Sequence, residues 1–483
     1  MDIPKRTSEK RPRQGEGVDT VERHADLGLS QSDFLRTLAS LLDEHSIRYC
    51  VLHSWQGLPD ELPSDLDIAV HPGDRARLPF VFRRLQNKGY LLVQCLNYFA
   101  QAYYFVFSWF EGETLKFVAV DAIFEHRRSG LISLSGEELL AGRGRFKEFW
   151  VASPAAEFAY LLAKRTWKRS VPPSYAQRLK LLVEKLGRAQ AEKLAGKVFI
   201  GKLKAKVVEA CSNGSLDRLL GRIGAQPWLT SLLRHPLGLV RFLFGEALRV
   251  MRRSLQPTGL LVVVLGPDGA GKSTLVGRIS RALGPCFRRH RIFHWRPMVI
   301  LPQKETGAAV TDPHHAPPRG TLGSIVALLG ILLDYWLAYG LVLRPFLART
   351  GLVVFDRYYQ DLLIDPLRYR YSGPMWLAKL VSRFVPAPDL QFVVDAEDDV
   401  ILSRKREVPP EELRRQREGY QQFTLGALGA IPVKTDRGIE RTVEEATRFI
   451  VQFLTPRFQR RHAGWLACKP TDSDSSRAAG RKQ

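Results

Sequence analysis

Short runs rich in apolar residues recur through the C-terminal part of the chain, and segments with helical periodicity separate most of them. Unbroken apolar runs are typical of strands that are buried on both faces. Strands that alternate with helices predict a parallel sheet with helices on both faces. We therefore expect an α/β domain over residues 257–458, with strands at Leu260–Leu265, Arg291–Phe293, Leu352–Phe355, Leu390–Val394 and Ile431–Val433.

The N-terminal part has a different pattern. A helix is expected first, because Phe34, Leu35, Leu38, Leu41 and Leu42 recur at helical spacing. Several strand-like runs follow, without regular helices between them, which predicts an α+β domain over residues 29–165. The predicted strands are Tyr49–Leu52, Leu66–Val70, Ala102–Phe107 and Leu115–Val120.

Residues 166–256 are mostly helical in pattern and rich in Lys and Arg, and we expect a basic helical connector there. Its last segment, Leu237–Leu255, places four arginines among bulky apolar residues. Such a helix can lie on a membrane or bind acidic partners. The pattern favours a packing helix with solvated arginines. The polar, charged tails at 1–28 and 459–483 are predicted to be disordered.

The longest apolar segment is Leu322–Leu347. Asp334 interrupts it, Arg344 and Pro345 follow, and its uninterrupted part is shorter than the ~20 residues that span a bilayer. We interpret it as a buried helix of the α/β domain. Peripheral membrane contact is the less favoured alternative.

The charge and the cysteine content of the chain limit the kinds of ligand and the cellular compartment that we expect. The chain of 483 residues has 72 Lys and Arg against 49 Asp and Glu, a formal net charge of +23, which suits phosphate-rich ligands, nucleic acid or an anionic membrane. Its 5 cysteines form no CxxC pair, which indicates reduced thiols and argues against structural zinc. Residues 1–26 lack the apolar core of a signal peptide. We expect a cytoplasmic protein.

The most specific motif is GPDGAGKST at Gly266–Thr274, directly after the first strand of the α/β domain. Glycines let the backbone fold closely around phosphates, so that its N–H groups and the next helix face negative charge. Lys272 can reach the β- and γ-phosphates, and the Ser273 hydroxyl can bind Mg²⁺. The sequence therefore predicts a nucleoside triphosphate site made by Gly266, Asp268, Gly269, Ala270, Gly271, Lys272, Ser273 and Thr274.

Two further groups fit phosphoryl transfer. Asp356 and Arg357 end a predicted strand. A carboxylate there can hold Mg²⁺, and the arginine can bind an acceptor phosphate with two hydrogen bonds. Arg404 and Arg406 lie in a charged segment that contains prolines, where cationic side chains on a closing lid can neutralise developing charge.

With these motifs in order, the segment from Leu260 to Phe453 resembles the thymidylate kinase branch of the P-loop kinases. The resemblance rests on GPDGAGKST, on VFDRYYQD, and on PDL…VVDA followed by RKRE. It implies Mg²⁺-dependent transfer of the ATP γ-phosphoryl group to a nucleoside monophosphate. By position, the resemblance assigns Lys272 and Ser273 to ATP and metal, and Asp268 and Arg357 to the acceptor. Asp356 would assist metal or acceptor binding. Arg404 and Arg406 would belong to the lid.

The acceptor itself stays open. The segment His294–Gly320 is longer and richer in proline than in typical thymidylate kinases, and its Arg296 is placed where an arginine could bind an acceptor phosphate. The expected partners are ATP and a phosphate-bearing small molecule. Nucleic acid is not favoured, and a homodimer is an open possibility.

A second pattern lies in the N-terminal domain. Ser54 precedes Asp65 and Asp67, which point to the same face of a strand, and Asp121 ends a later strand. Three such carboxylates suit two-metal nucleotidyl transfer. Residues 34–121 resemble the minimal nucleotidyltransferase pattern, with His53 in place of a glycine. An active nucleotidyltransferase, a retained fold with little activity, and an ATP-controlled binding module all remain open.

Overall fold

The computed structural model of the protein describes residues 28–99, 102–112, 114–128, 131–223, 236–298, 317–404, 409–426 and 430–461. The chain divides into two compact units. The C-terminal unit contains residues 250–453, and the N-terminal unit contains most of residues 28–249 together with 454–461. Most of the helical region that the sequence sets apart as a connector thus belongs to the N-terminal unit.

The C-terminal unit is built on a parallel sheet of five strands in the order β11-β12-β10-β13-β14. Every residue of β10 and β12 is buried, as their apolar runs predict. The first strand along the chain, β10, is central. The strands are β10 (Leu260–Leu265), β11 (Arg289–His294), β12 (Gly351–Asp356), β13 (Leu390–Asp395) and β14 (Ala430–Lys434).

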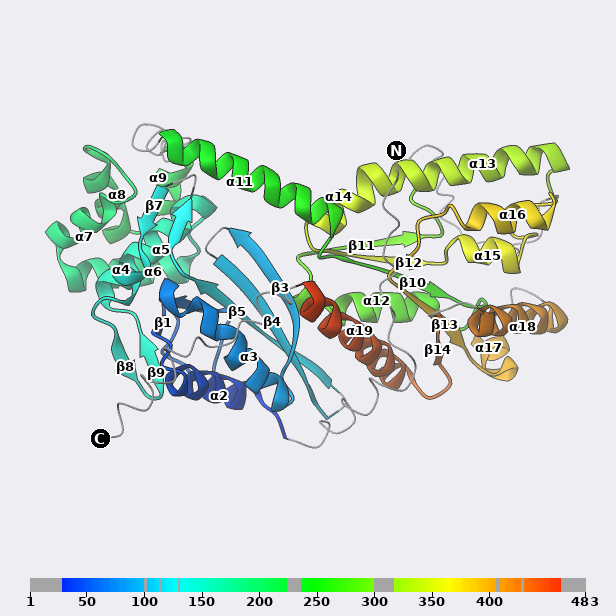
Figure 1. Ribbon diagram of the computed structural model, residues 1–483, viewed down its shortest axis with the longest axis horizontal. Coiled ribbons are helices and arrows are strands. Elements are labelled where there is room, and N and C mark those ends of the chain that lie inside the picture. Colours follow the sequence, from blue (N-terminus) through cyan, green and yellow to red (C-terminus); the bar gives the residue numbers. More distant parts are fainter. Residues whose placement is uncertain are drawn as a thin grey trace. The chain divides into compact units, whose positions relative to one another are not determined.

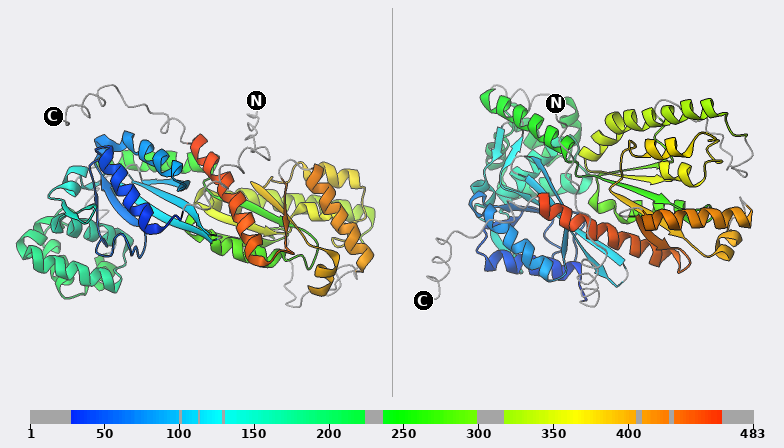
Figure 2. Two further views of the ribbon diagram at one scale, coloured as in Figure 1. Left: turned by 90° about the horizontal axis from the view of Figure 1, so that it is seen from below. Right: turned by 45° about the vertical axis from the view of Figure 1, so that its right-hand side comes forward.

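Helices cover both faces of this sheet (Figures 1 and 2). On one face, Leu261, Val263 and Leu265 of β10 pack in a core with residues of α13–α16, while α12 and α19 lie on the other face. The helices are α12 (Lys272–Ala282), α13 (Thr321–Ala338), α14 (Arg344–Ala348), α15 (Tyr359–Ile364), α16 (Met375–Ser382), α17 (Asp398–Arg404), α18 (Pro410–Gly426) and α19 (Ile439–Arg461). The predicted α/β class with a P-loop kinase sheet is confirmed.

The N-terminal unit contains a mixed sheet of seven strands in the order β3-β4-β5-β2-β1-β9-β8. β1 is antiparallel to β2 and parallel to β9, and β2 is parallel to β5. The strands are β1 (Tyr49–Val51), β2 (Leu66–Val70), β3 (Leu91–Phe99), β4 (Ala102–Glu111), β5 (Thr114–Ile123), β8 (Gly144–Phe146) and β9 (Phe149–Val151), and β6 (His126–Arg128) pairs with β7 (Leu131–Leu134) separately.

Two hydrophobic cores cover the two faces of this sheet. Tyr49 and Val51 join the core that contains α2 (Gln31–Glu44) and α3 (Leu78–Asn87), whereas Cys50 joins the core formed with the later helices. Those helices are α4 (Gly136–Leu140), α5 (Pro154–Lys168), α6 (Pro173–Leu186), α7 (Arg188–Ala195), α8 (Leu203–Ser212) and α9 (Leu216–Ile223). The predicted α+β arrangement is observed, but it does not by itself identify a nucleotidyltransferase.

Two helical predictions need correction. The segment Thr321–Ala348 is helical, but only its inner side is buried, and Leu322 and Val326 on its outer side are exposed. By length and composition, among the described residues this segment is apolar enough to cross a membrane. The basic helix α11 (Pro236–Leu255) also leaves Leu237 and Phe244 exposed, so its apolar residues are not packed as expected.

Candidate functional site

The GPDGAGKST loop connects the end of β10 to the first turn of α12, as the motif predicts. Gly266 has φ +143°, and a Cβ atom there would lie 2.4 Å from the carbonyl oxygen of Val394 on the neighbouring strand. Gly271 precedes α12 with φ +89°. A side chain at either position would strain the loop, so only glycine allows this backbone path. The loop is thus a glycine-rich turn directly before a helix N-terminus, an arrangement that favours phosphate.

Lys272 is buried at the start of α12. Its Nζ donates to the carbonyl oxygen of Pro267 at 2.7 Å and lies 3.4 Å from Asp268 Oδ1. Burial, together with the charge of Arg357, lowers the pKa of Lys272 to about 8. An incoming phosphate would favour the charged ammonium. The side chain is thus held inside the loop, close to where the motif places the phosphates.

Ser273 and Asp356 meet between neighbouring elements. β10 and β12 are parallel with Val264 opposite Asp356, so Asp356 lies at the strand end beside the loop. The Ser273 hydroxyl donates to Asp356 Oδ2 at 2.5 Å. Asp356 Oδ1 is buried and has no hydrogen-bond partner among the described residues. A hydroxyl and a carboxylate with an unused oxygen fit Mg²⁺, which prefers oxygen ligands.

Arg357 follows β12 and is buried, with φ +74°, in the left-handed region that non-glycine residues rarely adopt. Its backbone N–H donates to Val264 O at 3.0 Å, and its guanidinium contacts Asp268 and Asp361, the latter at 3.2 Å. Burial opposes its charge, but Asp361 and other partners outweigh that cost and raise the Arg357 pKa. The arginine is fixed beside the phosphate loop.

Arg368 is a residue that the sequence analysis did not select. It forms an ion pair with Asp268, which Arg357 also contacts. Burial would raise the pKa of Asp268, but the charges of Lys272, Arg357 and Arg368 hold it below its ordinary value. Asp268 therefore joins three cations at one edge of the loop. The sequence offered little reason to select Arg368, because it lies far along the chain from Asp268 in a segment rich in arginine and tyrosine.

A second missed residue is Asp334, which the sequence shows only as an interruption in an apolar helix. Asp334 is fully buried and accepts from the backbone N–H of Met298 at 3.1 Å. Its carboxylate also contacts Arg296 Nη1 at 3.5 Å, so the arginine considered for acceptor phosphate is paired with α13. Next to them, the rings of Trp295 and Tyr369 stack with centroids 4.4 Å apart.

Arg404 lies at the end of α17, on the far side of the phosphate loop. Its Nη2 donates to Thr435 O at 3.1 Å, and the Thr435 hydroxyl donates to Ala270 O at 2.8 Å. A Cβ atom on Gly271 would lie 3.9 Å from Arg404 Nη1. The structure thus brings Arg404 to the loop, whereas Arg406 lies outside the described residues.

In the N-terminal unit, the predicted carboxylates lie on adjacent strands. β2 and β5 are parallel, with Asp67 directly opposite Asp121. Asp65 precedes β2 and accepts a hydrogen bond from Tyr104 at 3.1 Å. The register therefore places Asp67 and Asp121 side by side on two inner strands of the sheet, with Asp65 just before one of these strands.

The surroundings of Asp67 differ from those of a metal ligand. Lys164 Nζ on α5 lies 2.6 Å from Asp67 Oδ1, and the Tyr160 hydroxyl donates to the same oxygen at 2.8 Å. His53 Nε2 lies 2.6 Å from Oδ2. Burial would raise the pKa of Asp67, but Lys164 and His53 hold it below its ordinary value. Within the described ranges, no group of three or more His, Cys, Asp and Glu residues is placed to hold a metal ion.

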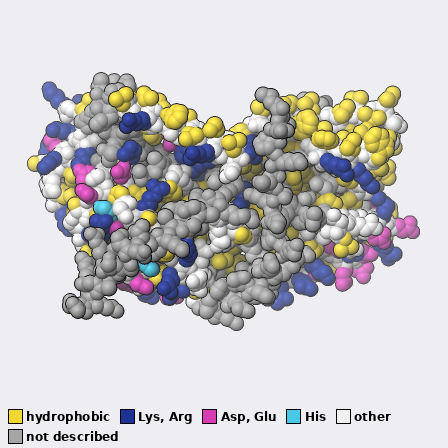
Figure 3. Space-filling model, viewed as in Figure 1, with side chains coloured by type: hydrophobic (Ala, Val, Ile, Leu, Met, Phe, Trp, Pro, Cys, Tyr) yellow, Lys and Arg dark blue, Asp and Glu magenta, His cyan; other side chains and the backbone are white. Residues whose placement is uncertain are grey.

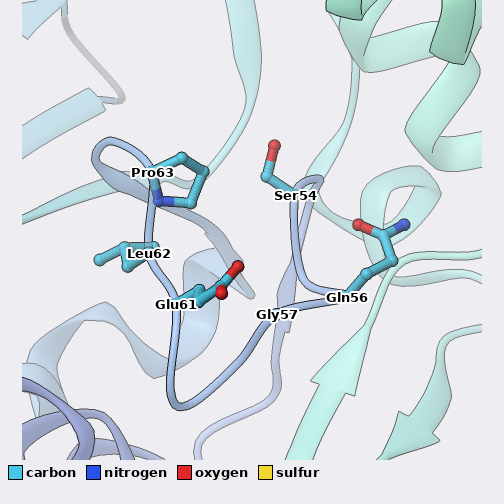
Figure 4. Close-up of a pocket in the computed structure, with 6 residues that line it drawn as sticks. All are labelled: Ser54, Gln56, Gly57, Glu61, Leu62 and Pro63. Carbon is cyan, nitrogen blue, oxygen red and sulfur yellow. The ribbon is translucent and has the colours of Figure 1, made fainter.

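His53, which stands where the nucleotidyltransferase pattern has glycine, is therefore turned inward onto Asp67. Its other ring nitrogen, Nδ1, lies 2.8 Å from Ser54 Oγ, and Ser54 has φ +56°. Ser54 also lines a cavity of about 520 Å³ with Gln56, Gly57, Glu61, Leu62 and Pro63 (Figure 4). The cavity lining contains one carboxylate and no Lys or Arg, which does not favour a triphosphate.

No family model matches the chain. Over 158 residues the sequence is 27% identical to a thymidylate kinase from Xanthomonas euvesicatoria pv. vesicatoria, with 32% of this chain and 65% of the relative covered. A thymidylate kinase from Xanthomonas campestris pv. campestris is 28% identical over 158 residues, with 32% and 64% covered. The matched 158 residues are thus similar to thymidylate kinases, and the chain spans about 65% of the length of the first of these relatives.

Two solved structures are similar in shape to part of the chain. A thymidylate kinase from Candida albicans is 15% identical, with a TM-score of 0.30 and with 40% of this chain and 91% of its own covered. A thymidylate kinase from Ehrlichia chaffeensis is 16% identical, with a TM-score of 0.29 and coverages of 39% and 97%. None of the relatives named here is a nucleotidyltransferase, and the N-terminal resemblance gains no support from them.

Proposed function

We propose that the protein is an ATP- and Mg²⁺-dependent phosphotransferase of the thymidylate kinase type, with a nucleoside monophosphate such as dTMP as acceptor. One observation carries the proposal. Lys272 and Ser273 leave the same phosphate loop, and Ser273 meets a buried Asp356 whose second carboxylate oxygen lacks a hydrogen-bond partner in the described chain. The sequence similarity to thymidylate kinases supports the same class.

Each residue then has a defined task. The loop amides and the Lys272 ammonium bind the β- and γ-phosphates and hold the chain of phosphates in one position. Mg²⁺, when bound by Ser273 and Asp356, supplies positive charge to these phosphates. Asp268 gives up part of its contact with Arg357, which then binds the acceptor phosphate. Arg404, fixed by Thr435 beside the loop, faces the charge that develops during transfer.

The test is ADP release by the full chain with Mg²⁺, ATP and each nucleoside monophosphate in turn. We expect release with dTMP and formation of dTDP, lost in Lys272→Ala and kept in Lys204→Ala, which changes an exposed lysine of α8. Release with another acceptor only would replace dTMP in the proposal. If no acceptor causes release while the wild-type protein is folded, the phosphotransferase assignment is wrong.

Nucleotidyl transfer by the N-terminal unit is a second candidate. The register of Asp67 opposite Asp121 favours it, and the ion pair between Asp67 and Lys164 opposes it. Incubation with nucleotide labelled at the α-phosphate distinguishes the two. Label transfer that disappears in the double variant Asp65→Asn/Asp67→Asn would support this candidate, and its absence in the wild type would leave the N-terminal unit without this activity.

A further inference from the structure

The outer side of α13 has an unusual composition for a surface helix. Leu322, Val326, Leu329, Leu333 and Trp336 recur three or four residues apart and form one stripe along it. These side chains are 49–80% exposed. A helix on the surface of a soluble domain normally presents polar residues on that side. Figure 3 shows hydrophobic side chains gathered where α13 lies.

The stripe continues onto α16. Trp376 and Leu380 are exposed on this helix, and Phe384 is exposed just after it. The Trp336 indole N–H donates to Phe384 O at 2.8 Å, which joins the two segments within the C-terminal unit. We call this joint surface, made by the exposed apolar side chains of α13 and α16, the α13–α16 face. An apolar patch of this extent marks an interaction site.

The charge on the α13–α16 face has one sign. Lys379 of α16 and Arg383, which directly follows this helix, are exposed beside its apolar residues. The only acidic residue in α13 and α16 is Asp334, which is fully buried and contacts Arg296. Aromatic and basic side chains around an apolar surface are typical of helices that lie at a membrane interface. The net charge of +23 adds attraction to anionic lipid.

We propose that the α13–α16 face binds the protein peripherally to an anionic lipid membrane. The helix lies on the bilayer and does not cross it, because its inner side, with Leu328, Tyr335 and Ala338, is fully buried in the core of the C-terminal unit. A second copy fits the face less well, since two such faces would bring lysines and arginines together without acidic partners.

The charge and composition of α11 point the same way. This helix leaves Val240 and Phe244 exposed beside the exposed Arg241, and it leaves Met251 exposed beside the exposed Arg252. It is a second surface with apolar and basic residues and belongs mostly to the N-terminal unit. Exposed apolar and basic side chains thus occur together on a second helix, whose sequence is independent of that of the α13–α16 face.

The test is flotation of the full-length protein with lipid vesicles. We expect binding to vesicles that contain phosphatidylglycerol, at least about tenfold weaker binding to pure phosphatidylcholine, and weakening with salt. Val326→Glu/Trp376→Glu should lower binding at least about tenfold, because both residues are exposed on the face. Leu425→Glu, at an exposed apolar residue of α18, is the matched control and should bind as the wild type does.

A second pair of variants tests whether the basic residues beside the face cause the preference for anionic vesicles. Lys379→Glu/Arg383→Glu should lose the preference for anionic vesicles, whereas Lys204→Glu should keep it. Each variant is first checked by circular dichroism and thermal unfolding without ligand, which separates loss of vesicle binding from loss of folding. Failure of the wild type to float, or equal flotation of Val326→Glu/Trp376→Glu, overturns the proposal. If that double variant instead converts a dimer to a monomer without vesicle binding in either form, the face is covered by a second copy and the proposal is wrong.

Discussion

At the scale of single residues, the phosphate loop is a place where buried charges balance each other. Lys272 and Arg357 are buried and Arg368 is largely so, and the carboxylates of Asp268 and Asp361 lie among them. Buried charges are tolerated when they are paired and hydrogen-bonded, and removing one partner leaves the other uncompensated. The cationic side chains that could bind a polyphosphate are therefore already in place beside the loop, paired with carboxylates, before a ligand binds.

The pH dependence of ATP binding follows from Lys272. Its pKa in the free protein is about 8, and bound phosphates raise it because they favour the ammonium. Affinity for MgATP should therefore fall as the pH rises above about 8, by up to about tenfold per unit. Titration calorimetry with a non-hydrolysable analogue between about pH 7 and 10 measures this. Lys272→Arg, which stays charged, should show a flat profile in that range, and matching slopes in the two proteins would contradict the prediction.

Asp361 offers a test of the charge balance by stability. It is fully buried, and it contacts Arg357 and the hydroxyl of Tyr420. Asp361→Asn should lower the free energy of unfolding by about 3 kcal/mol, because Arg357 loses a buried counter-charge. Urea denaturation measures the change. Asp399→Asn, at an exposed residue of α17, should cost less than about 0.5 kcal/mol. Equal losses in the two variants would show that Arg357 does not depend on Asp361.

At the scale of elements, the site depends on the order of the strands in the C-terminal sheet. Since β12 is hydrogen-bonded beside β10 and runs parallel to it, the end of β12 delivers Asp356 and Arg357 to the loop that follows β10. On the other side of β10, Val394 of β13 closes against Gly266. Ligands of open parallel sheets bind beyond the carboxyl ends of such strands.

The contact between the loop and β13 gives a prediction. Gly266→Ala would place a Cβ atom 2.4 Å from Val394 O at φ +143°, so we expect a loss of at least about 2 kcal/mol in unfolding free energy and weaker MgATP binding. The control is Gly277→Ala within α12, where no atom lies within 4 Å of the added Cβ. It should stabilise the helix by up to about 1 kcal/mol. Chemical denaturation compares the two, and a neutral Gly266→Ala would contradict the structure of the loop.

The sequence is most informative where the chemistry is local. β10 and the phosphate loop are contiguous, so the apolar run and the glycines identify them together. The strand β3 was not predicted, because Leu91–Phe99 lacks a regular alternation of apolar and polar residues. The pairing of Arg296 with Asp334 depends on α13 returning to the segment after β11, which no local pattern records. Because α13 is apolar on both sides, its pattern also could not distinguish the buried side from the exposed one.

At the scale of the whole molecule, the two units have separate hydrophobic cores and different sites. The C-terminal core lies on one face of a parallel sheet that carries the phosphate loop, and the N-terminal cores lie on the two faces of a mixed sheet. A ligand that binds only one folded unit stabilises that unit by mass action. Nucleotide should therefore raise the thermal stability of the C-terminal unit and leave that of the N-terminal unit unchanged.

Scanning calorimetry of the full chain tests this expectation. We expect more than one unfolding transition, with a single transition moved upward by MgATP. At a concentration about 100 times its Kd, the ligand adds about 2.7 kcal/mol to the unit that binds it. Lys272→Ala should remove the shift and keep both transitions. An equal shift of every transition would mean that the two units unfold together.

The ion pair between Lys164 and Asp67 has a consequence for how the two units respond to their surroundings. The counter-ion of Asp67 is covalently tethered through α5, so it cannot diffuse away or be removed by a chelator. Asp67 therefore keeps its counter-charge whatever the supply of divalent ions. Depletion of Mg²⁺ would therefore stop the phosphotransfer proposed for the C-terminal unit and leave this ion pair of the N-terminal unit unchanged.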